Sequence, residues 1–120
     1  MFFTVDRGSE AALSGALKIK PWLREWVVAL QKFIIERDIP KVGTFDREQL
    51  RQAAAKSNEV LRQVGPDIQL VESYVADNKT FCVYLAKDEA IIREHAEISG
   101  FPANKITMVK KMIDPTTAAA

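Results

Sequence analysis

The fold is decided by the stretch IQLVESYVADNKTFCVYLA, residues 68–86. Two runs rich in β-branched and aromatic residues, 68–76 and 80–86, flank the turn signal Asp77-Asn78-Lys79. Such runs favour strands, and a short polar turn between them predicts an antiparallel hairpin. The chain therefore contains at least one pair of neighbouring antiparallel strands, around which the rest of the domain is arranged.

Helical patterns lie on both sides of this hairpin. Upstream, Asp46 is suited to a helix N-cap, with Gln49 at the capping-box position, and Gly65-Pro66 ends the pattern. Downstream, Asp88 is suited to cap a second helix that runs to about Ser99, with Gly100 just past its end. The apolar stripe of the first helix, interrupted by a serine, is Leu50, Ala54, Ser57, Leu61 and Val64.

One further strand is predicted beyond each helix. Residues 32–39 form a β-favouring run that ends at Pro40, and residues 105–113 form another that ends at Asp114-Pro115. The resulting order, βαββαβ, predicts the α+β ferredoxin-like sandwich, a four-stranded antiparallel sheet with two helices on one face. We place this domain at residues 32–117 and expect a frayed tail at 118–120.

Residues 1–31 form an N-terminal extension of different character. Residues 1–16 show no apolar period, whereas an apolar stripe at helical spacing follows Pro21. That stripe predicts a short amphipathic helix, and we favour it over the alternative, one long strand from Trp26 to Ile39. The stripe consists of Trp22, Leu23, Trp26, Val27 and Leu30.

Composition narrows the class of protein. The 120 residues are 48% hydrophobic and 28% charged, which is typical of a globular domain. The longest apolar run is far shorter than the roughly 20 residues that cross a bilayer, and no secretory leader is recognisable, so we expect a cytoplasmic protein without a membrane segment. A net charge of +1 without a basic stripe argues against nucleic-acid binding, and the single cysteine excludes an internal disulfide.

Alternation along the strands predicts which side chains face away from the helices. The apolar set Phe81, Val83 and Leu85 is expected to pack under the helices. The opposite face would then be mixed in character, which suggests a dimer interface with a polar pocket. The alternative is that its polar groups are simply solvated. The members of this predicted face are Glu36, Glu72, Tyr74, Cys82 and Tyr84.

Three further residues are candidates for a site. His95, the only histidine, follows Ile91 and Ile92 on the core side of the second helix, where it is either a structural donor or a ligand and proton-transfer group. Ser57 either bonds back to its own helix or contributes to a pocket. Asn104, after the second helix, is suited to satisfy turn amides. Cys82 is expected to behave as an inert buried residue.

Six segments, taken together, resemble a family of small bacterial ferredoxin-like domains that includes nickel-binding and nickel-responsive proteins. The similarity covers residues 32–117 and implies a ferredoxin-like fold, a homodimer and Ni²⁺ as ligand. Ni²⁺ accepts imidazole and carboxylate, so our hypothesis is a site with His95 as lead ligand and Glu36 or Glu72 as carboxylate donors. Ser57, Tyr74, Cys82, Tyr84 and Asn104 remain pocket candidates. The segments are KFIIERDIP (32–40), VESYV (71–75), TFCVY (80–84), EHA (94–96), GFPAN (100–104) and IDPTT (113–117).

Three functions are compatible with these residues. The favoured one is a nickel-binding homodimer without catalysis. The second is a cofactor-independent enzyme of the dimeric α+β barrel type, in which His95 is the general base and Ser57, Tyr74 and Tyr84 surround a small substrate. The third is a regulatory or interaction module in which the Trp22 and Trp26 stripe docks on a partner or on the sister subunit.

Overall fold

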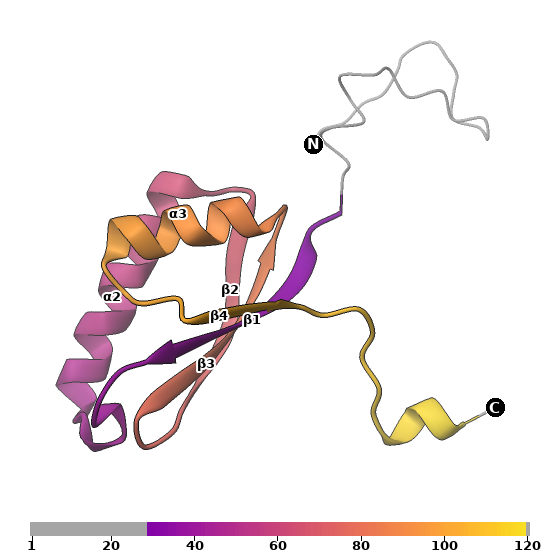
Figure 1. The fold of residues 1–120 in the computed structure, drawn as a ribbon, viewed down its shortest axis with the longest axis horizontal. Coiled ribbons are helices and arrows are strands. Elements are labelled where there is room, and N and C mark those ends of the chain that lie inside the picture. The colour runs from indigo at the N-terminus through magenta and orange to yellow at the C-terminus, as the bar shows by residue number, and fades with distance from the viewer. Residues whose placement is uncertain (1–28, 120) are drawn as a thin grey trace, which may run out of the picture.

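The computed structural model describes residues 29–119 and confirms the predicted order of elements (Figure 1). The features predicted for residues 1–28, including the helix from Pro21, lie outside the described residues. The elements are β1 (Gln31–Asp38), the 3-10 helix η1 (Val42–Thr44), α2 (Arg47–Val64), β2 (Ile68–Val75), β3 (Lys79–Ala86), α3 (Glu89–Ser99), β4 (Lys105–Met108) and the 3-10 helix η2 (Pro115–Ala118).

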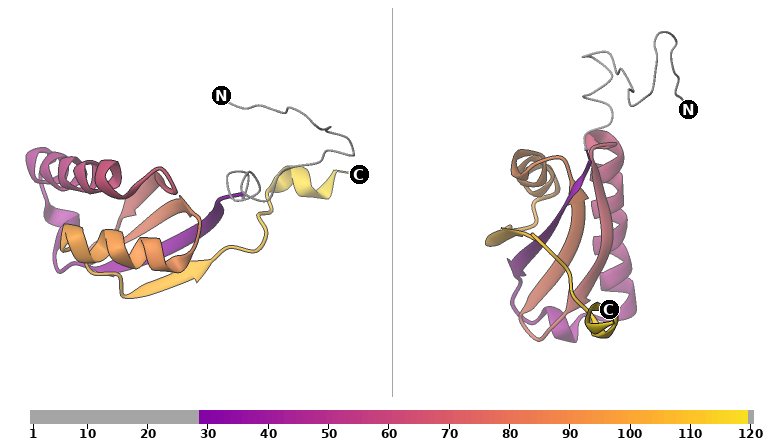
Figure 2. Two further views of the ribbon diagram at one scale, coloured as in Figure 1. Left: turned by 90° about the horizontal axis from the view of Figure 1, so that it is seen from above. Right: turned by 90° about the vertical axis from the view of Figure 1, so that its right-hand side faces the viewer.

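The four strands form one antiparallel sheet in the order β2-β3-β1-β4. β1 therefore lies inside the sheet, between β3 and β4. Both helices lie on one side of the sheet, and the C-terminal segment after β4 leaves the domain (Figures 1 and 2). This is the ferredoxin-like arrangement, and it leaves the second face of the sheet uncovered by α2 and α3.

The predicted helix ends are confirmed by their local hydrogen bonds. The Asp46 side chain accepts from the Gln49 amide, and the Gln49 side chain accepts from the Asp46 amide, which completes the capping box of α2. Asp88 accepts from the Ile91 amide at the start of α3. Gly100 ends α3 with a φ of 82°, a left-handed conformation that favours glycine.

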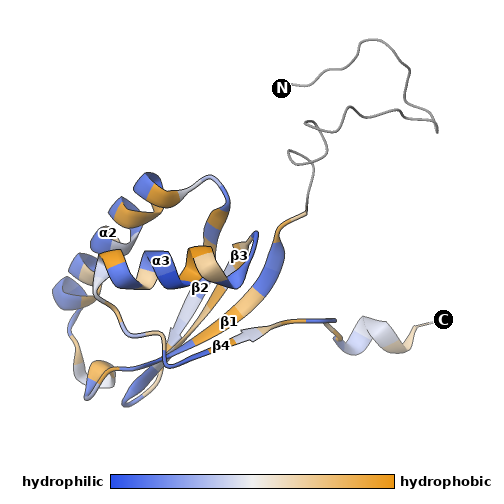
Figure 3. Cartoon of the chain, turned by 45° about the horizontal axis from the view of Figure 1, so that its top comes forward, coloured by the Kyte–Doolittle hydropathy of each residue, from blue (hydrophilic) through white to orange (hydrophobic). Residues whose placement is uncertain are grey.

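The core lies between the sheet and the helices. Both helices alternate hydrophilic and hydrophobic residues along their length, so each presents one apolar side to the sheet (Figure 3). The largest fully buried side chains are Tyr84, Ile35, Ile92 and His95. Two of these four carry polar atoms, so the centre of the domain is not purely apolar.

The face predicted for β3 was wrong. Cα pairing places Cys82 opposite Ile35 and Tyr84 opposite Phe33, and all four are buried on the helix side. Phe81, Val83 and Leu85 are only partly buried on the other side. Both sides of β3 are largely apolar, so hydropathy gives no clear alternation, and the prediction chose the wrong set. Glu36, Glu72 and Tyr74 do lie on the face away from the helices, as predicted.

Two details of the sheet were not visible in the sequence. The pairing of β2 with β3 shifts between Leu70 and Glu72, because Val71 is an extra, unpaired residue. β4 ends at Met108 rather than at residue 113, although the Val109 amide still donates to the Lys32 carbonyl. None of the helices formed by residues 29–119 is long and apolar enough to cross a bilayer.

Candidate functional site

A buried polar cluster occupies the space between the sheet and the helices, with Arg37 at its centre. Arg37 is the last of the three β1 side chains that point toward the helices, after Phe33 and Ile35, and it is only 3% exposed. Its Nη1 donates to the Pro102 carbonyl at 2.7 Å, and its Nη2 donates to the Tyr84 hydroxyl at 3.1 Å. The guanidinium also lies 5.9 Å from the ring centroids of Tyr84 and Phe101, within cation–π range. Arg37 thus joins β1, β3 and the loop after α3.

His95 completes the cluster from the side of α3. Its Nε2 lies 3.3 Å from Ser57 Oγ and 3.4 Å from the Ser57 carbonyl oxygen of α2. The ring packs edge-on against Tyr84, with 5.7 Å between the ring centroids. The Nδ1 atom is buried and has no hydrogen-bond partner among residues 29–119. The Ser57 hydroxyl therefore contacts the His95 ring and links α2 to α3.

Burial sets the charge states in this cluster. It lowers the pKa of His95, an effect that the Ser57 carbonyl opposes and the nearby Arg37 cation reinforces. Burial also raises the pKa of Tyr84, against the lowering influence of Arg37. Both changes favour the neutral form at pH 7. Arg37 is accordingly the cation of the cluster, and its charge is met by a carbonyl, a hydroxyl and two aromatic rings.

Sequence reasoning missed Arg37. A fully buried arginine is rare, so a charged residue near the end of a strand is ordinarily placed in solvent. The available signal was its position, because Arg37 continues the alternation of Phe33 and Ile35, two apolar side chains at every second position of β1. Tyr84 was predicted on the opposite face of the sheet. It was therefore not identified as the hydrogen-bond partner that a buried arginine requires.

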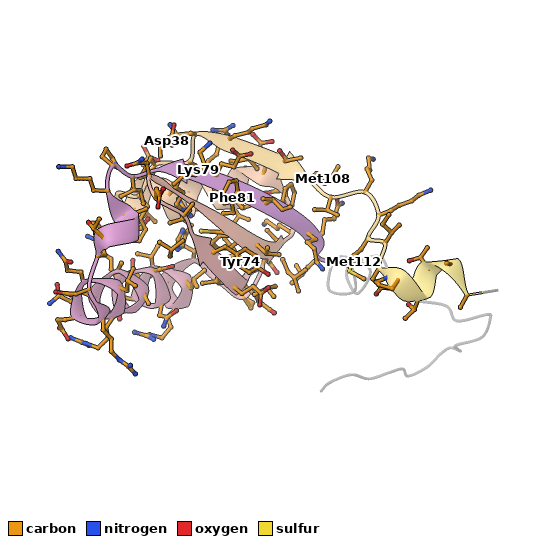
Figure 4. All side chains as sticks on the ribbon, turned by 90° about the horizontal axis from the view of Figure 1, so that it is seen from below. Asp38, Tyr74, Lys79, Phe81, Met108 and Met112 are labelled. Atoms are coloured by element: carbon orange, nitrogen blue, oxygen red, sulfur yellow. The ribbon has the colours of Figure 1, made fainter. Side chains whose placement is uncertain are left out.

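The sheet face away from the helices carries a second group of charges. We call it the open face, and it contains Lys32, Ile34, Glu36, Asp38, Gln69, Glu72, Tyr74, Lys79, Phe81, Val83, Leu85, Lys105 and Thr107. Lys79 Nζ lies 3.1 Å from Glu36 Oε1 and 3.7 Å from Asp38 Oδ1. Glu36 is the main cause of the raised pKa of Lys79. The Tyr74 hydroxyl donates to the Glu72 carboxylate. Figure 4 looks onto this face from below.

The three predicted nickel ligands are not brought together within one chain. His95 is buried on the helix side, whereas Glu36 and Glu72 lie on the open face, so the sheet separates them. The two glutamates belong to β1 and β2, which are about 10 Å apart because β3 runs between them. In the described part of the chain, no three His, Cys, Asp or Glu side chains are grouped to hold a metal ion.

The pocket candidates divide in the same way. Ser57 and Tyr84 join His95 in the buried cluster, while Tyr74 lies on the open face at 55% exposure. Cys82 is buried beside Thr80, with 3.6 Å between its Sγ and Thr80 Oγ1. Asn104 satisfies an amide, as expected, and the amide is that of Asp38 at 2.7 Å. The backbone amide of Asn104 also donates to the backbone carbonyl of Glu36, so these two hydrogen bonds fix the loop after α3 to β1.

Comparison with known proteins places this arrangement in a family. Residues 33–109 match the family described as nickel responsive protein SCO4226-like. Among solved structures, the chain is similar to the crystal structure of SCO4226 from Streptomyces coelicolor A3(2), with a TM-score of 0.58 and 15% sequence identity. That similarity covers 68% of this chain and 99% of the other, and at this identity it supports the fold alone. No curated protein matches the chain.

The family match covers the sheet, both helices and every residue of the buried cluster, from Phe33 in β1 to Val109 after β4. This protein therefore belongs to the SCO4226-like family of nickel responsive proteins.

Proposed function

We propose that this protein is a nickel-binding homodimer without catalytic activity, which binds Ni²⁺ between two open faces. The observation that carries the proposal is the placement of Glu36 and Glu72. Both carboxylates lie on the face that the helices leave uncovered, but about 10 Å separates their strands. A second copy, related by a two-fold axis, would bring a second pair of carboxylates to the same face. The family name supports nickel as the ion.

The buried cluster does not suit Ni²⁺. A dication bound to Nδ1 of His95 would lie near the Arg37 guanidinium, and none of the described buried residues is a carboxylate that could offset the charge. We therefore assign His95 a structural role and take carboxylate and water oxygens as the ligands, which Ni²⁺ accepts. A cytoplasmic location belongs to the same proposal and is supported by the lone cysteine, Cys82.

Nickel titration calorimetry on tag-free protein, together with elemental analysis, tests this proposal. We expect binding that is weakened in Glu36→Gln and in Glu72→Gln. Glu94→Gln is the matched control, because Glu94 is an exposed carboxylate on α3, outside the open face. Sedimentation velocity with and without nickel measures pairing. The proposal fails if the protein binds no nickel, or if Glu94→Gln weakens binding as much as the other two variants.

The alternative, a cofactor-independent enzyme, is favoured by one observation. Ser57, Tyr84 and His95 do gather in one cluster, and a neutral His95 is in the state of a general base. A substrate would have to enter a cluster in which His95 is fully buried and Tyr84 only 2% exposed. Screening small molecules by the NMR signal of His95 tests this alternative, since a substrate there must change that signal.

A further inference from the structure

The open face has an apolar centre that neither α2 nor α3 covers, although Lys79 Nζ lies over the Phe81 ring, 5.7 Å from its centroid. Ile34, Phe81, Val83 and Leu85 are each partly exposed, although they lie on the two internal strands, β1 and β3. Tyr74 adds an aromatic side chain at 55% exposure. Phe81 is labelled on this face in Figure 4. A sheet with helices on one side is normally covered on the other as well when that side is apolar.

The segment just before β1 has the composition to cover this face. Trp22, Leu23, Trp26 and Val27 are apolar at helical spacing, and they lie outside the described residues. The family match begins at residue 33, so this segment is an addition to the matched domain. The four side chains would present an apolar surface of the kind that packs on a sheet.

The position of β1 brings the segment to the right place. β1 is an internal strand, so the preceding residues start from the middle of one end of the sheet rather than from its edge. Ten residues run from Trp22 to Gln31; with 22–27 helical and 28–31 extended, they reach at most about 20 Å. An eight-residue strand is about 27 Å long, so the segment can return along most of the face.

We propose that residues 22–27 dock on the open face of their own chain and thereby compete with a second copy for it. The proposal rests on the proposed function, because that function assigns the same face to pairing. A short tether gives the attached segment an effective concentration of about millimolar. A free second copy at micromolar concentration must therefore bind much more tightly than the segment in order to displace it. The extension regulates access to the face.

Tryptophan fluorescence of the full chain tests the docking directly. Trp22 and Trp26 are the only two tryptophans, so the emission reports on this segment alone. We expect blue-shifted emission and slow acrylamide quenching at concentrations where sedimentation shows a monomer. In Val83→Lys, which places a charge on the open face, emission should shift to the red and quenching should quicken. Circular dichroism checks that the variant remains folded.

Val75→Lys is the matched control. Val75 is also a strand valine and is 46% exposed, but it pairs with Thr80, whose side chain lies on the helix side. We expect its emission to equal that of the unaltered chain. The proposal is overturned if the tryptophans of the unaltered monomer are already fully accessible, or if Val75→Lys and Val83→Lys shift equally. It is also overturned if the blue shift disappears on dilution in step with loss of a dimer, because a second copy would then be the cover.

Sedimentation of Trp26→Glu tests the competition. Weaker docking should free the face, so we expect this variant to dimerise at several-fold lower concentration than the unaltered chain. Equal or weaker dimerisation overturns the competition. If both proteins stay monomeric at every concentration, pairing through this face fails, and the proposed function fails with it, while the fluorescence result on docking stands independently.

Discussion

His95 should make the stability of this protein fall as the pH is lowered below about 7. Burial holds its pKa below the ordinary value of 6.5, and Arg37 also disfavours a second cation nearby. The unfolded chain binds a proton to this imidazole at higher pH than the folded chain does. Stability is therefore fully present above pH 6.5 and is lost as the pH falls toward the folded pKa.

The magnitude follows from the linkage between proton binding and folding. In the interval below 6.5 and above the folded pKa, each pH unit removes at most about 1.4 kcal/mol of unfolding free energy. The groups that face the ring are Ser57 from α2, Tyr84 from β3 and Arg37 from β1, and none of them is a carboxylate that could stabilise the imidazolium. The loss should therefore not be offset by a new ion pair.

Two assays measure this effect. NMR titration of the single imidazole should give a pKa below 6.5, and urea unfolding at several pH values should give the slope. His95→Gln is the control, because glutamine can still hydrogen-bond to Ser57 but does not titrate. Its absolute stability is immaterial, since only the slope is compared. A measured pKa at or above 6.5, or an equal slope in both proteins, would refute the reasoning.

Four further changes test the packing and the local conformation by urea unfolding. Arg37→Met removes two hydrogen bonds from a charged group and should cost about 2–4 kcal/mol, less than their sum because a buried charge is also removed; an unchanged midpoint would contradict the role given to Arg37. Ile92→Ala should cost about 2–5 kcal/mol at a fully buried site, against less than about 1 kcal/mol for Ile98→Ala, which is 45% exposed. Gly100→Ala should cost about 1–2 kcal/mol from its φ alone, because an added Cβ meets nothing within 4 Å, and Gly100→Asn should cost less. Asp88→Ala should cost about 1 kcal/mol through loss of the cap on α3, and no change would mean that the Ile91 amide finds another partner.

The order of helices and strands could be predicted from the sequence because the signals that mark their ends are local. Asp46 with Gln49, Asp88, and Gly100 act on neighbouring amides and carbonyls, so their patterns predict helix ends without knowledge of the tertiary fold. The turn predicted around Asp77 and Asn78 likewise joins β2 and β3, although Lys79 is already the first residue of β3. These features set the order of elements, and the order selects the fold.

The candidate site was harder to predict because its contacts are distant in sequence. Arg37 is held by Tyr84 and Pro102, which lie 47 and 65 residues later. Nothing local identifies such a partner, and hydropathy alone assigns an arginine to solvent. The faces of β3 were reversed for the same reason. Phe81 and Val83 are more apolar than Cys82 and Tyr84, but Tyr84 is the residue that contacts Arg37 of β1 and His95 of α3.

The internal position of β1 has a consequence for how the chain folds. β1 is made first, but its partners are β3, with Gln31 opposite Ala86, and β4, with Phe33 opposite Met108. Large loops must close before either pairing forms, and such topologies fold more slowly than helical bundles of equal size. During synthesis, β1 therefore stays unpaired, with Phe33 and Ile35 exposed, until almost the whole domain has left the ribosome.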